Sequence, residues 1–218
     1  MSYQIIDLAT WQRAEHFKFY SGASQPWFNI CAELDATLLS QTCKQQGVSF
    51  FHAYLYLTQV AINQHQPFKL RIVGDELRAY NRISISSTVL ADDEMMRFCD
   101  MPYAEDFDTF CHQAILAQQA AKSRPFVAAD FVGQAMAQDV IHLSVIPWIS
   151  FTSFSNARNT AQADSIPKII FGKSKETTSG MKMPFSVEVH HGVMDGLHVG
   201  RFFETMQTLF NQPELLFS

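Results

Sequence analysis

Two adjacent histidines and an aspartate follow a strand-like run near the end of the chain. Residues 184–189 read PFSVEV, and residues 190–196 continue as HHGVMDG. An unperturbed histidine has a pKa of about 6.5, so His191 can act as a general base near neutral pH. Such a base keeps one imidazole nitrogen free to accept a proton, and something must hold that tautomer. Asp195 could supply order, either by contacting the histidine or by bracing the loop through a buried ion pair.

Two other interpretations of this segment stay open on spacing alone. Two histidines at the end of a strand can be hydrogen-bonded structural residues. A metal site is also conceivable, with possible ligands at His190, His191, Asp195 and His198. However, no established ligand pattern such as HExxH is present, and adjacent histidines on a strand point to opposite faces of the sheet. We therefore expect no metal.

The histidines lie where the last predicted strand passes into the last predicted helix, a kind of junction that often carries catalytic side chains. Apolar residues at helical spacing predict this helix from about Leu197. The other predicted helices are one capped by Asp35 that runs to about Gln46 and is ended by Gly47, then 50–64, capped by Ser49, and 104–121. The predicted strands are a hairpin over 70–81, a strand from Ile83, and strands near 140–148, 166–173 and 183–190. This mixture predicts a mixed β-sheet with helices packed on it.

Composition limits the class of protein. The chain has 218 residues, 47% of them hydrophobic and 17% charged, which predicts a sizeable core, and the absence of a linker predicts one domain over 1–218. A net charge of −5 without a long basic run makes nucleic acid and membrane unexpected partners. No signal peptide or membrane span is recognisable, and the cysteines form no CxxC pair, so we expect a cytoplasmic protein with free thiols.

Several segments, in the same order along the chain, resemble the chloramphenicol acetyltransferases of the CoA-dependent acyltransferase superfamily. The run HHGVMDGLHVGRFFE is similar to the family pattern HHxxxDGxHV. The segments WQRAEHFKFY, LSVIPWISFTSF and LRIVGDELRAYN are similar to an N-terminal motif, a central motif and a hairpin of that family. The resemblance implies an α/β fold, a two-layer sandwich with a mixed β-sheet packed by helices. It also implies a homotrimer with active sites at the subunit interfaces.

The resemblance further implies acetyl transfer from acetyl-CoA to a hydroxyl of chloramphenicol, which inactivates the antibiotic. His191 would be the general base, with its tautomer held by a hydrogen bond to its own backbone carbonyl, and no covalent acyl-enzyme would form. Asp195 would brace the site through an ion pair with Arg13. Ser144 would hydrogen-bond the oxyanion of the tetrahedral intermediate. His190 would be structural.

The same resemblance suggests contacts to the coenzyme. Lys173 would lie near a phosphate of CoA, and Trp148 would belong to the core or to the wall of the coenzyme channel. Two family residues are replaced in this chain. Ile170 occupies the position of a family threonine that helps hold a water, and Ser174 occupies the position of a family tyrosine that could stack on adenine. Within the signature, Gly192 and Met194 replace the usual alanine and cysteine. These differences concern affinity and rate, because the base and its brace remain.

The acceptor pocket is expected to be apolar and aromatic, because chloramphenicol carries a nitrophenyl ring. Tyr20 aligns with a family pocket residue, and Phe131 and Phe154 are further candidates. His191 would come from one subunit and most of the acceptor pocket from its neighbour. Two alternatives stay open: an O-acyltransferase of the same family acting on a different hydrophobic alcohol, and a non-catalytic protein that binds hydrophobic ligands.

Overall fold

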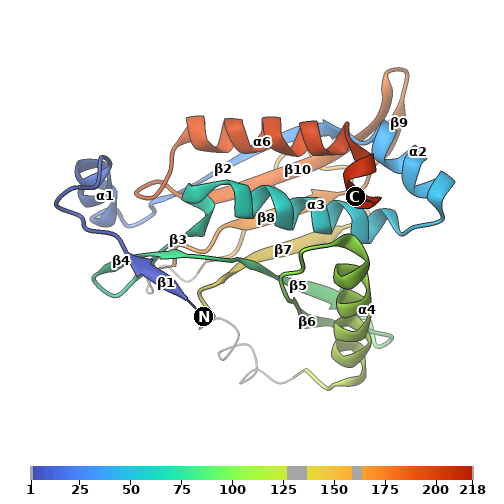
Figure 1. Ribbon diagram of the computed structural model, residues 1–218, viewed down its shortest axis with the longest axis horizontal. Coiled ribbons are helices and arrows are strands. Elements are labelled where there is room, and N and C mark those ends of the chain that lie inside the picture. The colour runs from blue at the N-terminus through green and yellow to red at the C-terminus, as the bar shows by residue number, and fades with distance from the viewer. Residues whose placement is uncertain (1, 127–136, 159–163, 218) are drawn as a thin grey trace.

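A mixed β-sheet forms the centre of the computed structural model, which describes residues 2–126, 137–158 and 164–217 (Figure 1). Within these residues the main sheet has seven strands. Their order begins with β2 (Trp27–Asp35), β10 (Gly180–His190), β8 (Lys168–Gly172) and β7 (Val140–Ile146), and continues with β5 (Ser84–Leu90) and β6 (Met96–Met101). β9 (Lys175–Thr177) also pairs with β10. The pairs β5–β7 and β7–β8 are parallel and the others antiparallel, so the expected mixed sheet is confirmed.

A smaller sheet carries the hairpin that the sequence predicts. It consists of β1 (Tyr3–Ile5), β4 (Glu76–Tyr80) and β3 (Leu70–Val73), in that order. Gly74 lies in the turn with a φ of 59°, a left-handed conformation that glycine adopts without steric cost. The predicted hairpin is therefore confirmed, and β1 adds a strand at its edge.

The predicted helices are present, with small shifts at their ends. The four predicted helices are α2 (Thr37–Gln46), α3 (Phe50–Gln64), α4 (Phe107–Ser123) and α6 (Gly196–Phe210). Helix α1 (Ala14–Ser21) and the short 3-10 turns η1 (Gln66–Lys69) and η2 (Pro213–Phe217) were not predicted. Ser49 caps α3 as predicted, because its hydroxyl accepts a hydrogen bond from the His52 amide. Gly47, with a φ of 68°, ends α2. Helix α2 begins one residue later than predicted, because Ala36 is its N-cap; Asp35, the predicted cap, stays in β2 and accepts a hydrogen bond from the Thr37 amide.

Helices α3 and α6 lie over one face of the sheet (Figure 1). Side chains on this face are apolar: Val187, Ile169 and Leu143 stand opposite one another on three neighbouring strands and are buried. Phe185, on the same face of β10, contacts the ring of Phe202 from α6. Burial of such side chains is the main source of stability. The expected two-layer arrangement is confirmed.

The opposite face of the sheet is polar, because side chains alternate along each strand. One polar row across β10, β8 and β7 consists of Glu188, Lys168 and His142, which pair with one another. Each is the sequence neighbour of a residue in the apolar row, so its side chain points to the other face. Ser144 lies two residues further along β7 and therefore on the same polar face. This face carries the side chains considered below.

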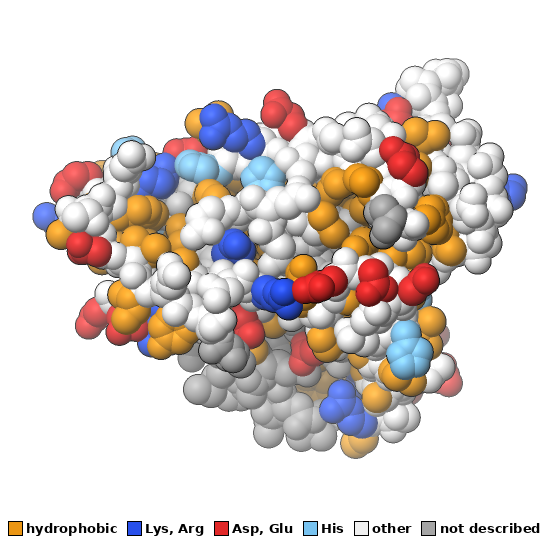
Figure 2. All heavy atoms as spheres, in the orientation of Figure 1, with side chains coloured by type: hydrophobic (Ala, Val, Ile, Leu, Met, Phe, Trp, Pro, Cys, Tyr) orange, Lys and Arg blue, Asp and Glu red, His pale blue; other side chains and the backbone are white. Residues whose placement is uncertain are grey.

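Figure 2 shows how charged and hydrophobic side chains are distributed on one face of the molecule. On the face seen in Figure 2, acidic, basic and hydrophobic side chains are interspersed, and no extended basic patch is visible outside the grey atoms. In the described part of the chain, no helix is both long and apolar enough to cross a bilayer.

Candidate active site

His191 lies in a tight turn between the last strand and the last helix. Strand β10 ends at His190, which pairs with Trp27 of the edge strand β2. The His191 amide then donates to the Pro26 carbonyl at 2.7 Å, and the Val193 amide donates back to the His190 carbonyl at 3.0 Å. The backbone of the histidine is thus fixed by hydrogen bonds on both sides of the turn.

The ring of His191 is held between two aromatic side chains. Tyr20, from α1, stacks on it with a centroid distance of 4.0 Å and an interplanar angle of 7°, and Phe28, from β2, contacts it at 4.7 Å. Its Nδ1 atom is buried and has no hydrogen-bond partner among the described residues. The expected hydrogen bond from Nδ1 to the residue's own carbonyl is therefore not formed. That carbonyl instead accepts from the Arg13 guanidinium at 3.3 Å.

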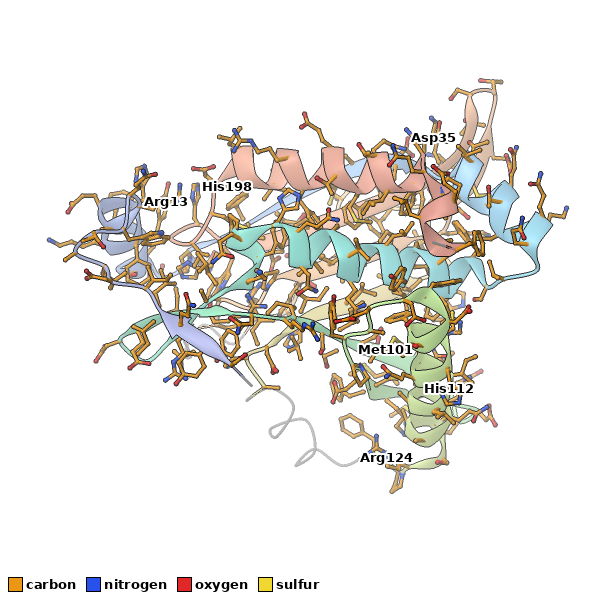
Figure 3. The ribbon with its side chains drawn as sticks, viewed as in Figure 1. Arg13, Asp35, Met101, His112, Arg124 and His198 are labelled. Atoms are coloured by element: carbon orange, nitrogen blue, oxygen red, sulfur yellow. The ribbon has the colours of Figure 1, made fainter. Side chains whose placement is uncertain are left out.

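Arg13 links the two ends of the histidine turn. Its Nη1 atom binds the Asp195 carboxylate at 2.7 Å while its Nη2 atom donates to the His191 carbonyl. The side chains of Arg13 and Asp195 are 16% and 33% exposed, so the pair is partly shielded from water. Figure 3 shows Arg13 and His198 near each other at the end of the molecule where α6 begins. One guanidinium thus ties α1 to the turn and to the start of α6.

Asp195 is also the N-cap of α6. Its Oδ1 atom accepts from the Leu197 amide at 3.2 Å and lies 2.8 Å from Nδ1 of His198. Nδ1 of His198 lies 3.1 Å from the Asp195 amide as well, so a protonated Nδ1 donates to the carboxylate and an unprotonated one accepts from the amide. Partial burial alone would raise the pKa of Asp195, but the Arg13 hydrogen bond and His198 outweigh it and lower the pKa to about 2. The aspartate is therefore ionised at neutral pH.

His190 has a structural environment. Its Nδ1 atom accepts from the Gly192 amide at 3.1 Å, and its ring meets Trp27 edge-on at 6.0 Å. Burial, and next the positive charge of Arg158, lower the pKa of His190 to about 4. The ring is therefore neutral at physiological pH. In the described residues, no group of three or more His, Cys, Asp or Glu side chains is arranged to hold a metal ion.

Ser144 lies on β7, beside a small cavity of about 290 Å³. Its hydroxyl is 3.3 Å from that of Thr88 on β5. Ile170, which replaces the family threonine, is its neighbour on β8 and lines the same cavity. Its lining combines polar residues with the apolar residues Met96, Phe98, Leu143 and Ile170, and the apolar and aromatic acceptor pocket expected from the sequence stays a prediction.

A larger cavity of about 940 Å³ lies next to the small one, and both are lined by Thr88 and Met96. Trp148, Lys173 and Ser174 all line the larger cavity. The structure thus brings together the residues for which the family resemblance implies contact with CoA. Trp148 is 64% exposed, which excludes the alternative that it belongs to the core.

The aromatic pocket candidates differ in their placement. Tyr20 lies against the histidine ring, as described above. Phe154 is half-buried and packs on Phe151 at a centroid distance of 5.7 Å, but it lines neither of the two cavities. Phe131 lies outside the described residues.

His191 and Ser144 do not meet within one chain. Ser144 stands opposite Ile170, and Ile170 stands opposite Ser186, so Ser144 and Ser186 are two strands apart. His191 follows Ser186 by five residues. With strands about 4.8 Å apart and a rise of about 3.3 Å per residue, the Cα atoms of His191 and Ser144 are roughly 20 Å apart. A histidine of this chain therefore cannot act on a substrate beside its own Ser144 without a large rearrangement.

A buried network of charged residues, Arg158, Glu188 and Asp164, lies next to this site and was not predicted from the sequence. Arg158 binds Glu188 at 2.6 Å and Asp164 at 2.5 Å, and the Arg158 and Glu188 side chains are only 6% and 8% exposed. The second carboxylate oxygen of Glu188 accepts from Asn156 at 3.2 Å. One signal was available: the alternation in SVEVH places a charged residue on the polar face of a strand that is otherwise buried.

Solved structures identify the fold. A chloramphenicol acetyltransferase superposes with a TM-score of 0.88 at 29% identity, over 96% of this chain and 100% of that chain. A dihydrolipoamide acetyltransferase of Azotobacter vinelandii gives a TM-score of 0.65 at 16% identity, over 94% of this chain and 89% of that chain, and so shares the fold. The fold is that of the CoA-dependent acyltransferases, and the protein is an acyltransferase.

Sequence relatives define the family more narrowly. The family model described as chloramphenicol acetyltransferase matches residues 1–207. Chloramphenicol acetyltransferase 3 of Escherichia coli is 29% identical over 213 residues, which cover 97% of this chain and 98% of the relative. A chloramphenicol acetyltransferase of Staphylococcus aureus is 29% identical over 216 residues, covering 98% of each chain. The chain belongs to the chloramphenicol acetyltransferase family.

Proposed function

We propose that this protein transfers the acetyl group of acetyl-CoA to a hydroxyl of chloramphenicol and so inactivates the antibiotic. The observation that carries the proposal is the double contact of Arg13, which binds the Asp195 carboxylate and the His191 carbonyl at once. A rigid guanidinium fork of this kind fixes a loop and with it the direction of a catalytic ring. Membership of the family supports the choice of substrates.

In the proposed mechanism His191 acts as the general base. Nδ1 is buried, which leaves Nε2 to take the proton of the acceptor hydroxyl. The resulting oxygen nucleophile attacks the thioester carbonyl, and the tetrahedral oxyanion accepts a hydrogen bond from the hydroxyl of Ser144. The intermediate then collapses, the C–S bond breaks, and the imidazolium returns its proton to the CoA sulfur. No acetyl-enzyme forms, so both substrates are bound before transfer.

Acetyl-CoA is the co-substrate in this proposal, and the larger cavity is its binding site. A volume of about 940 Å³ is at the upper end of the range for ligand pockets. Lys173 would bind a phosphate of the coenzyme, and the exposed ring of Trp148 would cover the pantetheine arm. Thr88 lines both cavities, and its hydroxyl lies 3.3 Å from that of Ser144. A thioester bound in the larger cavity beside Thr88 would therefore be within reach of Ser144.

The active site of the proposal lies between two copies of the chain. The separation of roughly 20 Å between His191 and Ser144 supports it, because general base catalysis needs hydrogen-bond contact. We propose a homotrimer in which His191 of one copy faces Ser144 of the next, in the cytoplasm, with residues 1–218 forming one catalytic domain. Two observations support a single domain: the described residues form one hydrophobic core cluster, and the family model matches residues 1–207.

Steady-state turnover tests the proposal. Purified protein is given acetyl-CoA and chloramphenicol, and release of the CoA thiol and formation of acetyl-chloramphenicol are followed. His191→Ala should lower turnover by about 10²–10⁴ or more, because the base is lost. His112→Ala is the matched control and should keep full activity, since His112 is exposed on α4, far from Arg13 (Figure 3).

Two results would contradict the proposal. Full activity of the His191→Ala variant would remove the assigned base. Accumulation of a stable acetylated enzyme from acetyl-CoA alone would replace the ternary mechanism by a covalent one.

A further inference from the structure

The small cavity beside Ser144 is lined by both apolar and polar residues. The apolar ones are Met96, Phe98, Leu143, Ala157 and Ile170. The polar ones are Ser86, Ser87, Thr88, His142, Ser144, Asn156 and Lys168. Strand register places Ser86, His142 and Lys168 in one row across β5, β7 and β8, so their side chains share one face of the sheet. A ligand in this cavity therefore meets a row of polar groups on that face, with Ile170 two residues from Lys168 on the same face.

Lys168 is the cation among the polar lining residues of this cavity. Its ammonium donates to the Ala157 carbonyl at 2.7 Å, and within the described chain it forms no salt bridge within 4.0 Å. An ammonium group carries three donors, so further hydrogen bonds to a ligand are available. His142, its neighbour on β7, is neutral at physiological pH, because burial lowers the pKa of His142 to about 4.

The carboxylates near Lys168 are engaged elsewhere. Glu188, opposite Lys168 on β10, accepts from Arg158 and Asn156, and Asp164 also binds Arg158. Burial, and next the positive charge of Arg158, lower the pKa of Lys168 in spite of Glu188 and Asp164. The surrounding groups thus stabilise the ammonium only in part, and an anion placed beside it would stabilise its charge further.

We propose that the small cavity binds acceptor alcohols that carry a carboxylate, and that Lys168 determines this specificity by binding the carboxylate. The inference rests on the proposed function, because it assigns the cavity beside Ser144 to the acceptor. The apolar side chains, Ile170 among them, would contact the carbon skeleton, the hydroxyl would point toward Ser144, and the carboxylate would lie beside the Lys168 ammonium. A hydroxy acid is then a better acceptor than its neutral analogue of the same shape.

A matched pair of acceptors tests the inference. The probes are para-(hydroxymethyl)benzoate and its neutral amide, para-(hydroxymethyl)benzamide, which have nearly the same shape. The acetyl-CoA-dependent kcat/KM is measured for both and for chloramphenicol with the intact enzyme. A hydrogen bond to a charged group predicts a preference of about 10- to 100-fold for the benzoate.

Variants of Lys168 test whether its ammonium group causes the preference for the benzoate over the benzamide. Lys168→Met should lower the benzoate-to-benzamide ratio by about tenfold or more, and Lys168→Arg should keep most of it. Lys168→Gln, which can still donate to the Ala157 carbonyl, gives the same test if the methionine variant fails to fold. Lys173→Met is the matched control: it should weaken use of acetyl-CoA with both acceptors and leave the ratio unchanged.

The outcomes distinguish failure of the inference about Lys168 from failure of the proposed function. A ratio near one in the intact enzyme, or a ratio unchanged in Lys168→Met and Lys168→Gln, overturns the inference even where chloramphenicol is acetylated. Turnover of the benzoate without turnover of chloramphenicol supports the inference and overturns chloramphenicol as acceptor. Absence of turnover with all three acceptors overturns both.

Discussion

Asp195 has two separable structural functions, and substitution can measure each. It accepts a charge-assisted hydrogen bond from Arg13, and it caps α6 through the Leu197 amide. Asp195→Asn removes the charge but keeps a good N-cap, whereas Asp195→Ala removes both. The difference between the two variants therefore isolates the contribution of the cap.

The magnitude of the charge contribution follows from the pKa of Asp195, which falls from 3.8 to about 2. Each unit corresponds to about 1.4 kcal/mol, so the full shift would be worth about 2.5 kcal/mol. The side chain is 33% exposed, and solvent screening reduces this to about 1–1.5 kcal/mol. Loss of the N-cap adds about 1 kcal/mol. We expect Asp195→Asn to cost about 1–1.5 kcal/mol and Asp195→Ala about 2–2.5 kcal/mol.

Urea unfolding at neutral pH, followed by tryptophan fluorescence, measures these free energies. A double-mutant cycle with Arg13→Met then gives the coupling energy between the two side chains, expected at about 1 kcal/mol. The same variants are assayed for acetyl transfer, because loss of the brace should lower kcat more than it changes KM for acetyl-CoA. A control substitution at Arg82, whose exposed ion pair with Glu105 lies outside the site, should cost at most about 0.5 kcal/mol.

Equal costs for Asp195→Asn and Asp195→Ala would refute the assignment of a capping function. A coupling energy near zero would refute the ion pair as a brace, whatever the effect of either single substitution.

Three further predictions concern the same site. Ser144→Ala should lower kcat by about 10²–10³ with little change in KM, measured by steady-state thiol release; an unchanged kcat would exclude an oxyanion donor at this position. Lys173→Met should raise KM for acetyl-CoA by about three- to tenfold, and the effect should shrink in high salt, because the contact is to a phosphate; an effect independent of salt would argue against a charge contact. The pKa of Asp195 is lowered on folding, so its contribution to stability is complete above about pH 4 and is lost as pH falls toward 2. The difference in unfolding free energy between the wild type and Asp195→Asn should therefore be constant above about pH 4 and shrink as pH falls toward 2. A difference that stays constant down to pH 2 would contradict the lowered pKa.

The longest periodic segments were predictable from the sequence. The helix 50–64 and the final helix follow from apolar spacing, and Ser49 and Gly47 follow from capping chemistry. Three strands of the main sheet were missed, of which β9 has only three residues. β6 reads MRFCDM and carries two charged residues, while β2 lies at the sheet edge with much of its length half-exposed, so neither shows a clean alternation.

The parts of the candidate site were predictable to different degrees. The contact between Arg13 and Asp195 was expected because both lie in motifs of the family, although 182 residues separate them. Lys168 was missed because it looks like an ordinary lysine at the start of a strand. Its importance comes from strand register, which sets it beside His142 and opposite Glu188. Register depends on pairing between distant segments, and no local pattern in the sequence encodes it.

The central claim is that His191 of one copy acts together with Ser144 of another copy. Complementation tests it most directly: the inactive variants His191→Ala and Ser144→Ala are co-expressed, and mixed oligomers are purified through two different tags. A site shared between copies predicts that acetyl transfer returns, with about one site in three intact in each mixed trimer, because one of its three interfaces then combines both native residues. Mixed oligomers that form and stay inactive would contradict the account.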